Sequence, residues 1–158
     1  MRDITEYIAD FYSHFPSQNG VLPWEITPYI STIISKKILE LNTDDYAIAA
    51  GIAIHKTAII EKGVILKEPV IISGNCFVAS HAYLRGGVFL GEGVRIGPGS
   101  EIKSSFIGYH SAMAHFNFIG DSIIGGHVNF EAGALIANHY NERLDKTIWA
   151  QVKGSRTN

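Results

Sequence analysis

A repeat of six residues runs through the middle of this chain and constrains its fold more than any other feature. From Ile48 to Ile102, ten consecutive hexads each begin with an aliphatic residue. The fifth position of most hexads is small or β-branched, as at Val64, Cys76 and Ala82. This period matches neither the 3.6-residue repeat of an amphipathic helix nor the alternation of a strand. Hexads of this kind are typical of a parallel β-helix.

The hexads therefore predict an all-β fold, a left-handed parallel β-helix in which three hexads make one coil. The first aliphatic residue of each hexad is expected to point into the core, and residues three hexads apart are expected to stack on one face. The phase of the repeat slips by one residue at Phe106 and again at Ile123, and the pattern ends near residue 137. We expect about five coils.

The residues on either side of the repeat follow other patterns. Residues 1–15 place apolar side chains on one helical face, and Thr27-Pro28 resembles the N-cap and first-turn proline of a second amphipathic helix. We expect these two short helices to fold over the first coil, whose strand edges would otherwise be exposed. After residue 137 the chain is either a weak cap or a loop that leads to further coils of a longer protein. The predicted domains are a helical cap at 1–46, the β-helix at 47–141 and an irregular tail at 142–158.

Composition excludes several classes of function. The 158 residues carry a net charge of −2 with mixed signs, which argues against a nucleic-acid binder because such a protein needs a basic surface. The longest apolar or glycine run, from Ala47 to Ile54, is too short to span a membrane. A signal-peptide pattern is lacking and a single cysteine excludes an internal disulfide, so we expect a cytoplasmic protein. That cysteine, Cys76, is expected to fill the core.

Two cations are expected side by side on one face of the β-helix. Arg85 and Lys103 both hold the second, outward position of hexads that lie one coil apart. Neighbouring strands are about 4.8 Å apart, so the two positive charges would repel each other unless an anion lies between them. The alternative is a pair of solvated surface cations. Asn138 follows the start of a later hexad on the same face and would lie near the pair.

The seven histidines supply candidate catalytic and metal-ligating groups. His115 lies in the hexad between the two phase slips, which are expected to bend the lattice and redirect side chains as a bulge does. His110 and His127 hold the same position of hexads one coil apart, so their side chains should stack. Two histidines could supply two of the three protein ligands of a catalytic zinc site. The sequence offers no evident third ligand, so we expect no bound metal.

The motifs become specific between residues 100 and 142. This segment resembles the β-helix acetyltransferase domain of the bifunctional N-acetylglucosamine-1-phosphate uridylyltransferases and of related sugar-nucleotidyltransferase-like proteins, which are hexapeptide-repeat acyltransferases. The resemblance covers about residues 20–141. The positions that keep the family's spacing, both slips included, are Glu101-Ile102-Lys103, His115, Gly120-Asp121, Ile124-Gly125, Val128-Asn129 and Ala132-Gly133.

The resemblance implies transfer of an acetyl group from acetyl-CoA to the amine of a glucosamine-1-phosphate-like sugar or a nucleotide sugar. It further implies a homotrimer with its sites between subunits. The family's catalytic histidine falls on His115, and a neutral imidazole can accept the proton that the attacking amine sheds. The resemblance assigns no residue of this chain to coenzyme A. The family's substrate contacts fall on Arg85, Lys103, Phe118, Asn129 and Asn138.

The chain departs from the family pattern at several positions. Phe118 stands where the family has a tyrosine, which removes a hydroxyl donor from the expected site. His139 replaces a second tyrosine, and Leu144 replaces a lysine. No nucleotidyltransferase domain precedes the helices, so uridylyl transfer is not expected.

Two further functions stay open beside the acetyltransferase. One is a metal enzyme similar to the γ-carbonic anhydrases, which would rest on His81, His110, His115 and His127. The other is a non-catalytic β-helix that serves as a scaffold or assembly module. Metal analysis separates the first from the acetyltransferase, and a coenzyme A binding assay separates the second.

Overall fold

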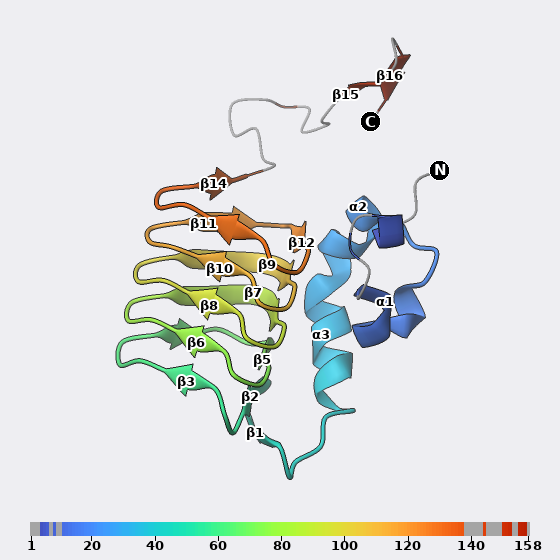
Figure 1. Cartoon of the computed structure of the whole chain (residues 1–158). Coiled ribbons are helices and arrows are strands. Elements are labelled where there is room, and N and C mark those ends of the chain that lie inside the picture. Colours follow the sequence, from blue (N-terminus) through green and yellow to red (C-terminus); the bar gives the residue numbers. More distant parts are fainter. Residues whose placement is uncertain are drawn as a thin grey trace.

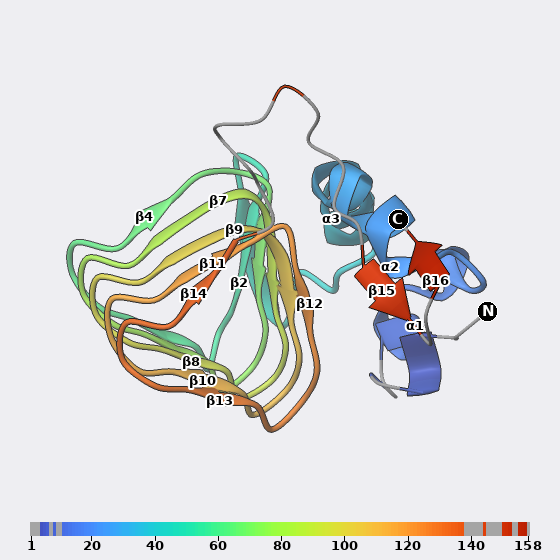
Figure 2. The same cartoon turned by 90° about the horizontal axis from the view of Figure 1, so that it is seen from above.

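Short parallel strands wind into a three-sided β-helix, and helices pack along one of its sides (Figure 1). The structure is a computed structural model that describes residues 4–6, 8, 11–137, 144, 150–152 and 155–157. Seen along its axis, the β-helix is a rounded triangle with the helices outside one edge (Figure 2). The predicted left-handed parallel β-helix of about five coils, preceded by helices, is confirmed.

The strands form one parallel ladder on each side of the β-helix. The covered face consists of β2 (Ile52–His55), β5 (Val70–Ile72), the second halves of β7 (Tyr83–Leu90) and β9 (Glu101–Ile107), and β12 (Ile123–Ile124). The middle face consists of β3 (Ile59–Ile60), β6 (Phe77–Val78), β8 (Arg95–Ile96), β10 (Ala112–Met113) and β13 (Asn129–Phe130). The ion-pair face consists of β4 (Ile65–Leu66), the first halves of β7 and β9, β11 (Phe118–Gly120) and β14 (Leu135–Ile136). Farther along the chain, β15 (Ala150–Val152) pairs with β16 (Ser155–Thr157).

The hexad repeat decides which side chains fill the β-helix. First-position residues such as Ile72 and Leu84 are fully buried, and fifth-position residues such as Val70 and Cys76 pack beside them in the same core. Burying one such aliphatic side chain stabilises the fold by about 1.5–3 kcal/mol. The predicted inward orientation of these positions is therefore confirmed.

Both phase slips arise at the corner between the ion-pair face and the covered face. This corner contains two residues in β7, Gly86 and Gly87, but Ser104 alone in β9, because Arg85 pairs with Lys103 while Val88 pairs with Ser105. The next coil repeats the shortened corner, since Gly120 pairs with Lys103 and Ile123 pairs with Phe106. Each shortened corner removes one residue from the hexad phase.

The first hexad was expected to be part of a coil, and this expectation is wrong. β1 (Tyr46–Ala49) runs antiparallel to β2 as a hairpin. The two turn residues, Ala50 and Gly51, have φ of 46° and 73°, and a tight two-residue hairpin needs such left-handed conformations. Ile48 is consequently 36% exposed, and β1 covers the backbone edge of β2.

The helical region begins with short pieces. They are η1 (Ile4–Glu6), α1 (Phe11–His14), η2 (Pro16–Gln18), α2 (Pro23–Ile26), η3 (Thr27–Tyr29) and α3 (Ile30–Ile38). One continuous helix over residues 1–15 is not observed, because Ile8 lies outside any helix. Thr27 is not the N-cap of the second helix either. Helical structure already begins at Pro23, where the Glu25 carboxylate accepts the Leu22 N–H at 3.0 Å.

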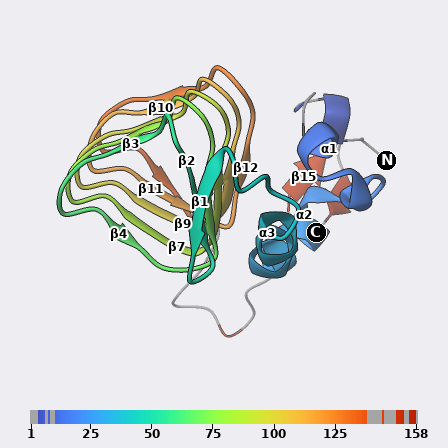
Figure 3. The same ribbon diagram turned by 90° about the horizontal axis from the view of Figure 1, so that it is seen from below.

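The helices lie along the covered face and not over the first coil, as Figures 1 and 3 show. The reason lies in the outward side chains of this face, since Ile71, Phe89 and Phe106 are apolar and buried beneath the helices. The rings of Phe89 and Phe106 stack with centroids 4.9 Å apart, and Phe11 packs edge-on against Phe106 at 5.1 Å. The expectation that the helices cap the first coil is therefore wrong.

Candidate functional site

The predicted cation pair exists, but each cation has a carboxylate partner. Arg85 and Lys103 lie opposite each other in the parallel register of β7 and β9. The Arg85 guanidinium contacts Glu101 at 2.6 Å, and the Lys103 ammonium donates to both carboxylate oxygens of Asp121 at 2.7 and 2.8 Å. The repulsion expected between the cations is thus offset by two carboxylates.

These four residues form a row of two ion pairs, each joining neighbouring coils, that runs from the ion-pair face to the corner at Asp121. Their side chains are about one-third exposed, 31–36%, so solvent screens them and each pair contributes at most about 1 kcal/mol to stability. The main effect of these ion pairs is to fix the orientation of the four side chains, because charge-assisted hydrogen bonds have narrow geometry. A phosphate that approached Arg85 or Lys103 would share them with the carboxylates.

Phe118 lies on the same face and completes the part of the predicted site that one chain assembles. It pairs with Glu101 in the ladder of β9 and β11 and is half-buried. Its ring covers the backbone at Gly120, where an added Cβ would lie 2.9 Å from the ring. Arg85, Lys103 and Phe118 are therefore neighbours.

His115 lies elsewhere, at the corner between the middle face and the ion-pair face. Its side chain is exposed, and its carbonyl accepts the Gly133 N–H at 2.9 Å, which holds the backbone between coils. Within the described part of the chain, no side chain bonds to its imidazole. The next residue, Phe116, is 72% exposed and lays its ring over Gly99 of the preceding coil.

Asn129, another predicted residue, does not lie on the ion-pair face. Asn129 lies on the middle face and donates from Nδ2 to the Glu131 carboxylate at 3.0 Å, and Asn138 lies outside the described residues. His115 precedes the ion-pair face at one corner, whereas Lys103 pairs with Gly120 at the other end of that face. Among the described residues, one chain therefore keeps His115 and Asn129 apart from the face that holds Arg85, Lys103 and Phe118.

The phase slips redirect Asp121, not His115. Both slips lie at the corner that contains Asp121, whose backbone is left-handed with φ 49° and donates its N–H to the Lys103 carbonyl at 2.9 Å. The interpretation that the slips re-aim His115 is therefore wrong. Glu101 and Asp121 were not predicted as site residues. The phase slip beside Asp121 could have indicated that this residue has a special position.

The predicted stacking of His110 and His127 is confirmed. Their ring centroids are 5.3 Å apart, and Tyr109 packs edge-on against His127 at 4.9 Å. His81 and His115 lie at a different corner from this pair. Over the described ranges, no three metal-ligating side chains come close enough together to hold an ion. The four histidines of the metal-enzyme alternative do not assemble within one chain.

Cys76 is a core residue, as predicted. Burial raises the pKa of its thiol to about 11, and the thiol donates to the Gly91 carbonyl at 3.0 Å. Burial also raises the pKa of the Tyr46 hydroxyl. A thiol in this environment stays protonated near neutral pH and is not a nucleophile.

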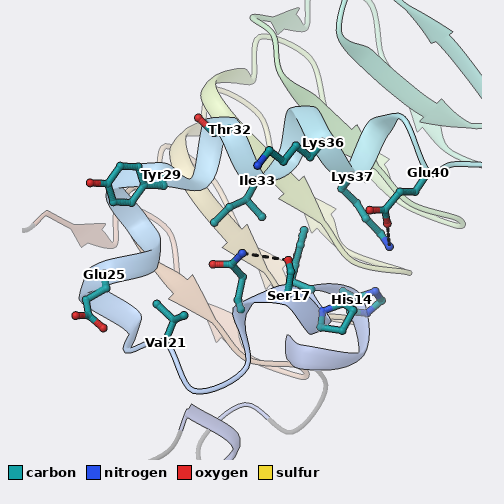
Figure 4. Close-up of a pocket in the computed structure, with 13 residues that line it drawn as sticks. His14, Ser17, Val21, Glu25, Tyr29, Thr32, Ile33, Lys36, Lys37 and Glu40 are labelled. Carbon is teal, nitrogen blue, oxygen red and sulfur yellow. Dashed lines mark hydrogen bonds and ion pairs between the residues drawn. The ribbon is translucent and has the colours of Figure 1, made fainter.

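A cavity of about 930 Å³ lies in the helical layer, between η2 and α3. Figure 4 shows Ile33, Val21 and Tyr29 among its walls, with Lys36 and Lys37 along α3. Lys37 is paired with Glu40 at 3.0 Å. All of its lining residues belong to the helical region, so it is separate from the sequence-predicted site.

Comparison with known proteins identifies the family. Residues 48–152 match the model of the GMPPB C-terminal domain. This chain belongs to the GMPPB C-terminal domain family. The predicted resemblance to the hexapeptide β-helix domains of sugar-nucleotidyltransferase-like proteins is confirmed. No match was found among the curated proteins.

Two solved structures are also similar to the chain. The first is perosamine N-acetyltransferase from Caulobacter crescentus in complex with CoA and GDP-perosamine, at 18% identity over 54% of this chain and 47% of that one, with a TM-score of 0.29. The second is the acetyltransferase domain of PglB from Neisseria gonorrhoeae, at 20% identity over 54% and 48%, with a TM-score of 0.32. This chain thus spans about half the length of each. Among its described residues, no helix is long and apolar enough to cross a membrane.

Proposed function

We propose that this chain is the β-helix part of an acetyl-CoA-dependent acyltransferase acting on the amine of a sugar phosphate or nucleotide sugar. His115 is its general base. The observation that carries the proposal is the His115 imidazole, which is exposed and unpaired among described side chains while its backbone is held between two coils. It occupies the position of the catalytic histidine in the resembling acetyltransferases.

The reaction joins the amine nitrogen to the carbonyl carbon of the thioester. As the C–N bond forms, the amine proton passes to the neutral imidazole, and the C–S bond then breaks. Coenzyme A leaves as a thiolate, and the His115 imidazolium returns the proton to it, which gives the thiol and restores the neutral imidazole. A positioned base contributes about 10²–10⁴-fold to such a step.

We propose a homotrimer as the active assembly. Arg85, Lys103 and Phe118 share one face, whereas His115 and Asn129 lie on a corner and on another face. A site between subunits would bring the His115 corner of one copy to the ion-pair face of another. A concentration-independent monomer in sedimentation velocity would contradict this assembly.

The test is a thiol-release assay with acetyl-CoA and glucosamine-1-phosphate. His115→Ala should lower kcat by about 10²–10⁴-fold and change KM little, because the proton moves mainly in the transition state. His81→Ala is the matched control, since His81 is also exposed and lies at the same corner two coils away. Undiminished turnover in His115→Ala would remove the histidine from the mechanism.

A non-catalytic scaffold is the second candidate, and two observations favour it. Phe118 lacks the hydroxyl of the family's tyrosine. In addition, Arg85 and Lys103 are already paired with Glu101 and Asp121. A scaffold would assemble without binding coenzyme A. Calorimetry with coenzyme A therefore separates the candidates, since binding supports the enzyme and its absence in a well-assembled protein supports the scaffold.

A further inference from the structure

A second cavity lies where the helices meet the coils drawn at the top of Figure 1, with α2 beside β12. Its volume is about 340 Å³, within the range of small-molecule sites. Neither the acetyl-transfer step nor the predicted site residues use it. It is lined by Ile4, Ile8, Pro23, Trp24, Thr27, Asp121 and Ile123.

One wall of this cavity is an exposed aromatic surface. The Trp24 side chain is 63% exposed, so its indole presents a flat apolar face to a ligand. The turn that carries it is held at its start by the bond from the Leu22 N–H to the Glu25 carboxylate. A single exposed tryptophan needs no explanation by itself, so the polar residues of the lining decide what the cavity can bind.

The cavity is also lined by a residue with a carboxylate. Asp121 lies at the shortened corner, and the Lys103 ammonium binds both of its carboxylate oxygens at 2.7 and 2.8 Å. Lys103 is itself the ladder neighbour of Arg85. The cavity lining therefore includes an aromatic side chain, a carboxylate and a hydroxyl residue, Thr27, and the carboxylate is bound to Lys103, the neighbour of Arg85.

We propose that this cavity is a sugar subsite that holds one pyranose ring against Trp24. A pyranose has an apolar face of C–H groups, which suits an indole, and a rim of hydroxyls, which suits the Asp121 carboxylate and the Thr27 hydroxyl. An anomeric phosphate would extend towards Lys103 and Arg85. The subsite rests on the proposed function for its class of ligand, and it recognises the sugar without taking part in proton transfer.

The experiment is calorimetric titration of the full chain with glucosamine-1-phosphate and, separately, with inorganic phosphate. Trp24→Ala should weaken the affinity for the sugar phosphate by about tenfold, near the upper value for one aromatic contact, and leave the affinity for phosphate unchanged. Tyr29→Ala is the matched control, because Tyr29 is 66% exposed on the same helical segment but lines the larger cavity (Figure 4). Both aromatic side chains are exposed, so neither variant should lower the unfolding midpoint.

Turnover provides a second readout that separates the subsite from the catalytic base. Trp24→Ala should raise KM for the sugar about tenfold at unchanged kcat, the opposite pattern to His115→Ala. Equal affinity for the sugar phosphate in Trp24→Ala and wild type overturns the subsite, whether or not acetyl transfer is observed. A loss confined to Tyr29→Ala overturns it too, in favour of the larger cavity. Trp24-dependent binding without any turnover supports the subsite and contradicts the proposed enzyme.

Discussion

The covered face and the ion-pair face are built from the same two long strands, β7 and β9, yet their outward side chains lie in opposite environments. On the covered face, Phe89 and Phe106 are at most 3% exposed beneath the helices. On the ion-pair face, Arg85 and Lys103 are about one-third exposed and paired with carboxylates. The backbone lattice is shared, so outward side-chain chemistry alone decides which face the helices cover.

The outward side chains of the two faces also differ in how much they contribute to stability. Burying a large apolar side chain contributes several times more than a partly exposed ion pair, which contributes at most about 1 kcal/mol. The covered face therefore holds the helices in place, while the outward ion pairs of the ion-pair face add little to stability.

The largest loss of stability is expected from a substitution on the covered face. Phe106→Ala should lower the free energy of unfolding by about 3–5 kcal/mol, because it removes a fully buried ring that packs on Phe11, Phe15 and Phe89. Phe118→Ala on the ion-pair face should cost about 1 kcal/mol, because that ring is half-buried. Urea unfolding of both variants measures the contrast. Equal losses would mean that the helices do not depend on this aromatic cluster.

A smaller loss of stability is expected from a substitution where α3 approaches the covered face. Gly87 and Gly133 both have left-handed backbones, with φ of 94° and 75°, so alanine should cost each about 1–2 kcal/mol. A Cβ at Gly87 would also lie 2.7 Å from the Ser31 Cα, whereas one at Gly133 would meet nothing within 4 Å. Gly87→Ala should therefore lose about 1–3 kcal/mol more than Gly133→Ala. Thermal unfolding tests this, and indistinguishable midpoints would contradict the close packing of α3.

The smallest effect on stability is expected on the ion-pair face. Lys103→Ala should lower the free energy of unfolding by about 1 kcal/mol or less, and the loss should shrink at high salt because the pair with Asp121 is partly exposed. The same variant should weaken binding of glucosamine-1-phosphate. Lys37→Ala, which breaks the ion pair between Lys37 of α3 and Glu40 just beyond the end of α3, is the control for a surface pair away from the proposed ligand. Unchanged ligand affinity in Lys103→Ala would show that the row of charges is only structural.

The sequence predicted the parts of the fold that depend on spacing along the chain. The burial of Leu84, the pairing of Arg85 with Lys103 and the stacking of His110 on His127 all follow from counting hexads. The β1 hairpin was missed because Ile48 matches the hexad phase, and the turn chemistry of Ala50-Gly51 was not weighed against it. The docking of the helices was missed because their apolar faces are compatible with any apolar surface.

The candidate site was predictable only in part. Counting placed Arg85 and Lys103 on one face, and the family resemblance added Phe118. Neither showed that Glu101 and Asp121 bind the two cations. Nor did the order of residues reveal that His115 lies across the ion-pair face from Lys103, or that Trp24 shares a cavity with Asp121. Those relations join segments that are far apart in the chain or lie on different faces of a coil.

The sequence by itself determined the β-helix, its inward residues and the stacking of its coils, because a six-residue period is a local rule that repeats from coil to coil. The tertiary structure alone decided which face the helices cover, which carboxylate each cation binds and which groups line the Trp24 cavity. The physical reason is that these outcomes depend on competition among side chains brought together by folding. A periodic pattern specifies direction, inward or outward, but it does not specify the partner that an outward side chain meets.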